Sequence, residues 1–160
     1  MKRAFWAAFL VTAAIIAQAG CSGGTRTPVA AKDFTLRDLS GNDVTLAGFR
    51  GKANVLIHFG TTWCPPCIEE IPDLTTLDEK YGDEELVVLY VDVNETEDIV
   101  RNFVTDHKIG YPTLLDSQGA AANAYNVEGI PANFLVDKEG LIQAASVAIP
   151  HEAIRELAGR

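Results

Sequence analysis

The chain has few cysteines and few basic residues, and both shortages exclude classes of protein. Three cysteines in 160 residues are too few for a small domain held together by disulfides. Lys and Arg number 13 against 22 Asp and Glu, a net charge of -9. Because phosphate binding requires a basic surface, we expect no nucleic-acid partner. The absence of an internal repeat excludes a solenoid. The 48% of hydrophobic residues predicts one folded domain rather than disorder.

The first 20 residues predict an export signal. Lys2 and Arg3 precede an uncharged run, residues 4–20, which is slightly shorter than the roughly 20 residues that span a bilayer. Secretory signals have this pattern, although a retained membrane anchor is the alternative. The Ala-Gly-Cys sequence that ends at Cys21 resembles the end of a bacterial lipobox, which makes Cys21 a lipidation candidate. Cleavage after Ala19 by an ordinary signal peptidase is the other possibility. Both place the protein in the periplasm or outer cell envelope.

Behind the signal we expect a flexible tether over residues 21–32 and one domain over residues 33–160. Residues 54–59 and 86–91 are almost wholly apolar, as in central strands covered on both faces. Between them, apolar residues recur every three or four positions and predict a helix: Ile68, Ile71, Leu74, Leu77 and Tyr81. Strand, helix and strand at this spacing form one right-handed βαβ unit.

The remaining elements are shorter. Turn formers between short apolar runs predict two hairpins, one from residues 33–36 and 44–46, the other from 133–136 and 141–144. Asn94 and Glu97 predict a capping pair for a helix that buries Ile99, Val100, Phe103 and Val104. A short strand at 113–115, a short helix at 120–125 and a last helix after Pro150 complete the chain. The fold class is therefore α/β, with a mixed sheet and helices on both faces.

The candidate site is the sequence Trp-Cys-Pro-Pro-Cys at residues 63–67, where the first central strand meets the first helix. Cysteines at i and i+3 share a helix face and can form a disulfide. Cys64 lies at the helix start, where free N–H groups and the helix dipole stabilise a thiolate. Cys67 lies one turn further in. We therefore expect Cys64 to attack a partner disulfide and Cys67 to resolve the mixed disulfide.

The other interpretations of this cysteine pair are weaker. A structural zinc site requires four ligands, but the third cysteine lies in the leader, and His58, His107 and His151 have no ligand spacing. A purely structural disulfide would close a loop of only two residues and constrain the unfolded chain little. We expect no metal and no cofactor other than the dithiol itself.

Pro65 and Pro66 tune the site, because a prolyl nitrogen carries no hydrogen. Only N–H groups from Cys67 onward remain to reach the Cys64 sulfur. With fewer N–H donors, the Cys64 thiolate is stabilised less than the corresponding thiolate of strongly oxidising dithiol proteins. We therefore expect the pair to donate electrons and act as a reductant.

Residues 59–67, followed by Ile-Glu-Glu-Ile-Pro at 68–72, resemble the membrane-tethered, thioredoxin-like TlpA/ResA proteins of bacteria. Phe-Arg-Gly-Lys at 49–52 and Gly-Ile-Pro at 129–131 belong to the same resemblance, which runs from about residue 33 to the C-terminus. It implies a thioredoxin-like fold with an N-terminal β-hairpin extension and a central strand and helix insertion. It also implies thiol:disulfide oxidoreductase activity.

The resemblance assigns further site residues. Glu70 matches an acidic residue beside the dithiol, which could take the Cys67 proton; a solvated helix glutamate is the alternative. Pro131 matches a proline held in cis that faces the cysteines, which makes the Ile130 backbone, together with Trp63, the docking edge for a partner chain. His58 either relays a proton to Cys67 or is simply buried and neutral.

The family implies a client, an electron donor and a monomer. The client is a disulfide-bearing exported protein, for example the haem-attachment CxxCH of apocytochrome c, and a membrane-embedded thiol reductase supplies the electrons. Two other functions stay open. A peroxidase is suggested by Thr61 three residues before Cys64, although Ile57 replaces the expected proline. A Sco-like copper chaperone would need three residues between its cysteines, where this chain has two.

Overall fold

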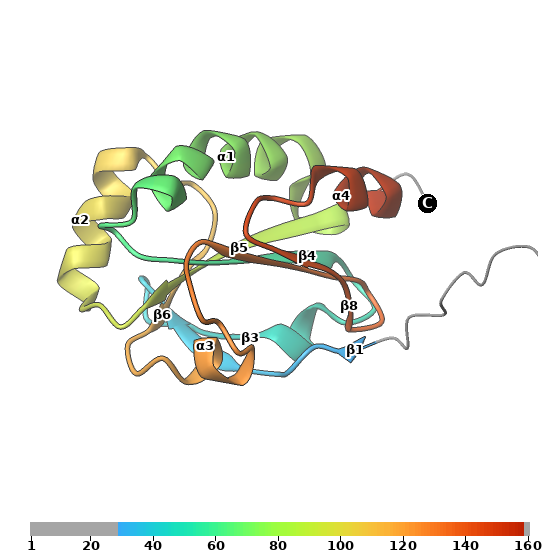
Figure 1. Ribbon diagram of the computed structural model, residues 1–160, viewed down its shortest axis with the longest axis horizontal. Coiled ribbons are helices and arrows are strands. Elements are labelled where there is room, and N and C mark those ends of the chain that lie inside the picture. Colours follow the sequence, from blue (N-terminus) through green and yellow to red (C-terminus); the bar gives the residue numbers. More distant parts are fainter. Residues whose placement is uncertain (1–28, 159–160) are drawn as a thin grey trace, which may run out of the picture.

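One eight-stranded mixed sheet forms the middle layer of the structure, a computed structural model that describes residues 29–158 (Figure 1). The strand order is β1-β8-β7-β4-β5-β6-β2-β3. The strands are β1 (Val29–Ala30), β2 (Thr35–Asp38), β3 (Asp43–Thr45), β4 (Asn54–Gly60), β5 (Leu86–Val93), β6 (Thr113–Asp116), β7 (Ala132–Val136) and β8 (Leu141–Ser146). Strands β4, β5 and β6 run parallel, while β7, β8 and the β2–β3 hairpin pair antiparallel.

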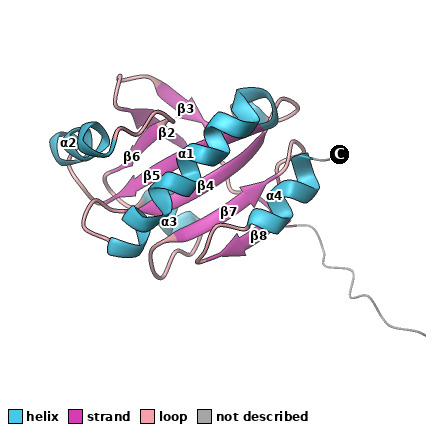
Figure 2. Cartoon of the chain, turned by 90° about the horizontal axis from the view of Figure 1, so that it is seen from above, coloured by secondary structure: helices cyan, strands magenta, loops and turns pink. Residues whose placement is uncertain are grey.

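Helices cover both faces of this sheet. They are η1 (Leu46–Phe49, a 3₁₀ helix), α1 (Pro65–Glu85), α2 (Glu97–His107), α3 (Ala120–Ala124) and α4 (His151–Ala158). Helices α1 and α4 lie on one side of the sheet and α3 lies on the other (Figure 1). Viewed from above, α1 crosses over the sheet, and α4 lies beside α1 on the same face (Figure 2).

Successive side chains of a strand point to opposite faces of the sheet, so the central strands contribute to two separate hydrophobic cores. On one face, Val55, Ile57 and Phe59 of β4 pack with residues of β5, η1 and α3. On the other face, Leu56 of β4 packs with Leu74 of α1 and further residues of β5, α2 and α4. Every residue of β4 is buried, which confirms the prediction of a central strand covered on both faces.

The predicted thioredoxin-like α/β fold is confirmed, including the N-terminal β2–β3 hairpin that extends the sheet beyond β6. The tether predicted over residues 21–32 is wrong at its end. Val29 and Ala30 form β1 against β8, and Ala31 is buried. Backbone pairing with β8 and the burial of Ala31 hold this segment, since Val29 itself is 60% exposed. The export signal and Cys21 lie outside the described residues.

The predicted capping pair is also wrong. Asn94 has a left-handed backbone (φ 62°), and its N–H donates to the Asp116 carbonyl at 3.1 Å. Helix α2 therefore begins later, with Thr96 at the N-cap position and no side-chain cap bond. The Glu97 carboxylate instead pairs with Arg101 one turn along. Within α2, Val100 and Phe103 are buried as predicted, but Ile99 is 49% exposed, because α2 presents a narrower stripe to the sheet than the sequence suggested.

Candidate redox site

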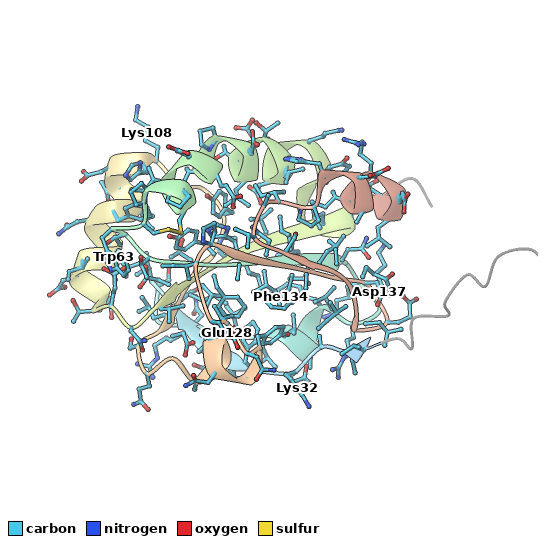
Figure 3. The ribbon with its side chains drawn as sticks, in the orientation of Figure 1. Lys32, Trp63, Lys108, Glu128, Phe134 and Asp137 are labelled. Carbon is cyan, nitrogen blue, oxygen red and sulfur yellow. A yellow bond between two sulfur atoms is a disulfide. The ribbon has the colours of Figure 1, made fainter. Side chains whose placement is uncertain are left out.

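The chain turns from β4 into α1 at one end of the sheet, and the two cysteines lie at that turn. Cys64 is the N-cap residue of α1, and its backbone is extended. Cys64 and Cys67 form a disulfide, with their Cα atoms 5.3 Å apart. Trp63 lies at this end of the molecule, opposite the end where Asp137 lies (Figure 3). The predicted cysteine pair is therefore assembled at the carboxyl end of a central strand, where α/β folds place ligands.

The two prolines limit the donors that reach the Cys64 sulfur. Pro65 and Pro66 fill the first two positions of α1, so the Cys67 N–H is the first available donor, and it reaches Cys64 Sγ at 3.3 Å. The Cys64 carbonyl accepts the Ile68 N–H at 3.1 Å, which continues the helix. The geometry matches the expectation that only N–H groups from Cys67 onward can reach the Cys64 sulfur.

The disulfide is shielded, but its surroundings are open. Cys64 is 3% exposed and Cys67 0%, so the two cysteines hardly differ in burial in this state. Trp63, by contrast, is 69% exposed, and Pro65 and Pro66 are exposed too. The indole beside the covered disulfide is therefore an exposed apolar surface.

The loop before β7 lies beside two pockets. The Ile130–Pro131 bond is cis, which agrees with the expectation drawn from the family. One pocket, about 340 Å³, is lined by Trp63, Thr61 and Ile130 among others. A second, about 350 Å³, is lined by Ile130, Pro131 and Val147 among others. Residues 127–130 line both pockets, so the segment that leads to Pro131 borders both hollows.

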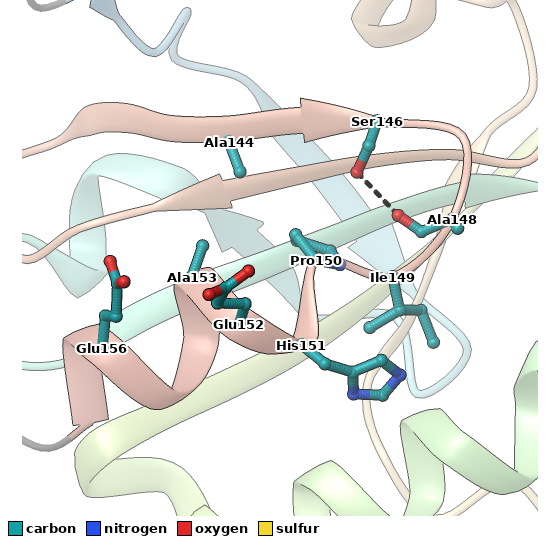
Figure 4. A pocket seen from close by; sticks show the side chains of 9 residues that line it. All are labelled: Ala144, Ser146, Ala148, Ile149, Pro150, His151, Glu152, Ala153 and Glu156. Atoms are coloured by element: carbon teal, nitrogen blue, oxygen red, sulfur yellow. Dashed lines mark hydrogen bonds between the residues drawn. The ribbon is translucent and has the colours of Figure 1, made fainter.

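A larger pocket, about 590 Å³, lies between β8 and the start of α4 (Figure 4). Its walls are mostly small side chains, including Ala144, Ala148 and Ala153, with Glu152 and Glu156 at its edge. No cysteine lines it.

His58 is the centre of a buried polar network between β4 and α1. It is fully buried on β4, and its Nδ1 lies 3.0 Å from Asn133 Oδ1 and 3.3 Å from Glu70 Oε2. Asn133 on β7 donates through Nδ2 to Glu70 Oε2 at 3.1 Å and to the Val147 carbonyl at 2.8 Å. The network thus joins α1, β4, β7 and the segment after β8.

Glu70 is held in this network rather than solvated on the helix surface. Burial raises the pKa of its carboxyl, but hydrogen bonds from His58 and Asn133, the His58 charge and the Ile149 backbone N–H outweigh burial, and the net pKa is lowered. Donors that stabilise a carboxylate have this effect. The structure therefore places Glu70 one helical turn from Cys67, as a charged partner of His58.

Gly60 provides space for this network. A Cβ on Gly60 would lie 2.7 Å from the Tyr90 hydroxyl and 2.9 Å from His58 Nε2. The Tyr90 ring stacks on the His58 ring at 5.0 Å, and its hydroxyl donates to the Thr61 carbonyl at 3.3 Å. Both groups need the volume that any side chain at position 60 would fill.

Sequence reasoning missed Asp92 and Glu95. Glu95 accepts the N–H of Thr62 at 2.6 Å and its hydroxyl at 2.7 Å, which fixes the segment before Cys64. Asp92 is 1% exposed; burial, together with the neighbouring Glu95 charge, raises its pKa to about 8. The sequence signal for Asp92 was an aspartate at the end of an apolar strand. An aspartate in that position normally indicates that the strand ends in solvent, so it did not predict a buried acid.

Two observations bear on the alternative functions, a peroxidase and a copper chaperone. The Thr61 hydroxyl is buried and, among the described residues, has no hydrogen-bond partner, so it does not bond to the Cys64 sulfur as a peroxidase pair would. Within residues 29–158, no three Cys, His, Asp or Glu side chains form a group that could hold a metal ion.

A sequence profile of the AhpC/TSA family matches residues 29–145. The chain belongs to the AhpC/TSA family. It is 35% identical over 112 residues to the thiol-disulfide oxidoreductase ResA of Bacillus thuringiensis subsp. konkukian, in an alignment that covers 70% of this chain but only 64% of that relative. It is 34% identical over 128 residues to the thioredoxin-like protein YneN of Bacillus subtilis, covering 79% and 72% of the two chains.

Comparison of the fold with solved structures also finds thiol:disulfide interchange proteins. The solution structure of a thiol:disulfide interchange protein from a Bacteroides species superposes with a TM-score of 0.74 at 26% identity, covering 84% of this chain and 91% of the other. The ResA-type resemblance inferred from the motifs is thereby confirmed. None of the described helices is long and apolar enough to cross a lipid bilayer.

Proposed function

We propose that this protein is a thiol-disulfide oxidoreductase that reduces disulfides in other proteins by exchange through Cys64 and Cys67. The observation that carries the proposal is the Cys64–Cys67 disulfide at the start of α1. The pocket-lined cis-proline loop and the ResA-named relatives support it.

Each turnover moves two electrons. The Cys64 thiolate attacks one sulfur of a client disulfide, the client S–S bond breaks, and the released client sulfur leaves as a thiolate that takes a proton. The Cys67 thiolate then attacks Cys64 Sγ; the Cys64–Cys67 bond forms and the second client sulfur leaves. The client is reduced to two thiols and the enzyme dithiol is oxidised to the disulfide seen here.

The single N–H that reaches Cys64 Sγ favours the reducing direction, because strong oxidants of this chemistry stabilise the thiolate and so favour their own reduction. The proposed location is the bacterial cell envelope, with lipidated Cys21 as membrane tether and a membrane-embedded thiol reductase as electron donor. The haem-attachment dithiol of apocytochrome c is the proposed client.

Insulin reduction tests the chemistry. The parent protein should precipitate insulin B chain when a dithiol recharges it, and Cys64→Ser should lower the rate to background. Cys67→Ser should instead accumulate a mixed disulfide with the client, visible by mass spectrometry. A Cys64→Ser protein as fast as the parent contradicts the proposal.

The reduction potential of the pair tests the direction. A reductant should lie near about -270 mV, whereas a value near about -120 mV indicates an oxidant. Replacing Pro65 or Pro66 with Ala restores an N–H at the helix start and should make the potential less negative. An unchanged or more negative potential in both variants contradicts the role given to the prolines.

A further inference from the structure

The hydrogen bonds around His58 determine which of its ring nitrogens carries the proton. Asn133 turns its amide nitrogen to two acceptors, the Val147 carbonyl and Glu70 Oε2, so its oxygen faces His58 Nδ1. An amide oxygen and a carboxylate only accept. In the neutral ring, Nδ1 therefore carries the hydrogen and Nε2 carries a lone pair.

The lone pair on Nε2 is buried and lies at the end of β4 that leads into the cysteines. Nε2 has no hydrogen-bond partner among the described residues and lies 2.9 Å from the position of a Cβ on Gly60. His58 and Cys67 are both 0% exposed, in the layer between the sheet and α1. Burial disfavours a charged imidazolium, so a buried imidazole takes up a proton only beside a counter-charge.

The groups that face His58 come from three elements, and one of these groups supplies that counter-charge. From α1, Glu70 lies 3.3 Å from Nδ1. From β5, Tyr90 stacks on the ring, and burial raises the pKa of its hydroxyl; Asp92, two residues further on the same strand, has its pKa raised to about 8. From β7 comes the neutral Asn133. Near neutral pH, Glu70 is the charged group in contact with the ring.

We propose that His58 is the proton acceptor for the Cys67 thiol in the resolving step, and that Glu70 orients the imidazole and balances its charge. This inference rests on the proposed function. Glu70 is poorly suited to take the proton itself, because Oε2 already faces two N–H donors, which stabilise the carboxylate and weaken it as a base. A carboxylate behind an imidazole is the arrangement by which serine hydrolases activate a nucleophile.

In this step the Cys67 S–H bond breaks and its proton moves to His58 Nε2, forming an imidazolium whose Nδ1–H faces the Glu70 carboxylate. The Cys67 thiolate attacks Cys64 Sγ, and the Cys64–client S–S bond breaks with its electron pair on the client sulfur. His58 then releases its proton to that client thiolate or to solvent. Electrons and protons balance without any further reactant.

The reagent 5,5′-dithiobis(2-nitrobenzoate) separates the two steps in the full, reduced protein. Attack by Cys64 releases a first coloured thiolate, and resolution by Cys67 releases the second. His58→Asn should slow the second release about tenfold or more and change the first less than twofold. Glu70→Gln, which keeps an acceptor for Nδ1–H but loses the charge, should slow the second release less than His58→Asn does.

His151→Asn is the matched control, because His151 is an exposed histidine with a carboxylate, Asp73, at 3.5 Å; both releases should match the parent. If His58→Asn keeps the parent's second release while Glu70→Gln loses it, Glu70 is the base and the inference is overturned. Failure of the proposed function differs, because the parent would then show no second release at all.

A spectroscopic test does not depend on variants that fold. Nitrogen-15 NMR of the parent should show neutral His58 protonated at Nδ1 and bare at Nε2. The pH dependence of the second release should also change in His58→Asn, which a merely structural role would not cause. A neutral ring protonated at Nε2, or an unaltered pH profile, overturns the inference.

Discussion

Glu70 and Asp92 are both carboxyls removed from water near the turn that carries Cys64, yet their pKa values move in opposite directions. Burial pushes both upward. Glu70 receives hydrogen bonds from His58 and Asn133, and its net pKa falls. Asp92 has no donor among the described residues and has another carboxylate, Glu95, as neighbour, so its pKa rises to about 8. Burial sets the cost of charge, and nearby donors decide whether the charge is kept.

The two carboxyls therefore have different consequences for the fold. Ionised Glu70 stabilises the native state by joining α1 to β4 and β7. Asp92 opposes folding wherever the unfolded chain would ionise it. A buried acid that lowers stability beside a reactive segment is typical of functional sites.

The largest effect is expected from Asp92→Asn. Between the ordinary pKa of 3.8 and about 8, native Asp92 holds a proton that the unfolded chain has lost, so the parent loses stability as pH rises through this window. The variant should gain about 5 kcal/mol in free energy of unfolding at pH 8, since each pKa unit is worth about 1.4 kcal/mol, and nothing at pH 3. Urea denaturation at several pH values measures this difference.

Asp116→Asn is the control for this experiment. Asp116 is equally buried, but it accepts the N–H groups of Ala121 and Ala122, so its replacement should destabilise the protein. A loss of stability in Asp92→Asn at pH 8 would contradict the comparison.

A smaller effect is expected from Gly60→Ala, which places a methyl group against the side chains of His58 and Tyr90. The new Cβ would meet the Tyr90 hydroxyl and His58 Nε2, and overpacking of this kind costs about 2 kcal/mol. Adding Tyr90→Phe removes one of the two contacts and should restore part of the loss. Thermal unfolding measures both changes.

Gly110→Ala serves as the control, since a Cβ there meets nothing within 4 Å. Its melting temperature should stay within a few degrees of the parent's, and an equal drop in both variants would show that the space at position 60 is not specific.

The smallest effect is expected from Glu70→Gln, with the opposite pH dependence to Asp92→Asn. The native pKa of Glu70 lies below its ordinary 4.5, so its contribution is present above that pH and is lost as pH falls through the native pKa. The variant should be about 1 kcal/mol less stable at pH 7 and should converge with the parent in acid. A constant difference at every pH would assign the effect to shape rather than charge.

Local pattern was enough to predict the cysteine pair, the central strands and the helix between them. Apolar runs and three-to-four spacing reflect burial directly, and the i, i+3 cysteines need only one helical turn to meet. The start of α2 could not be read in this way, because the Asn94 N–H is taken by Asp116, 22 residues later in the chain. Nor could Asn133, whose partners His58 and Glu70 come from β4 and α1.

The order of residues alone determined where the sulfurs lie, that two prolines precede the first N–H of the helix, and that the strands are buried, since these depend on neighbours within one turn or one strand. Tertiary structure decided which acids stay charged, which nitrogen of His58 is bare and why position 60 must be glycine. Those properties depend on donors, carboxylates and rings brought together from β4, β5, β7 and α1, because desolvation and hydrogen bonding act across space rather than along the chain.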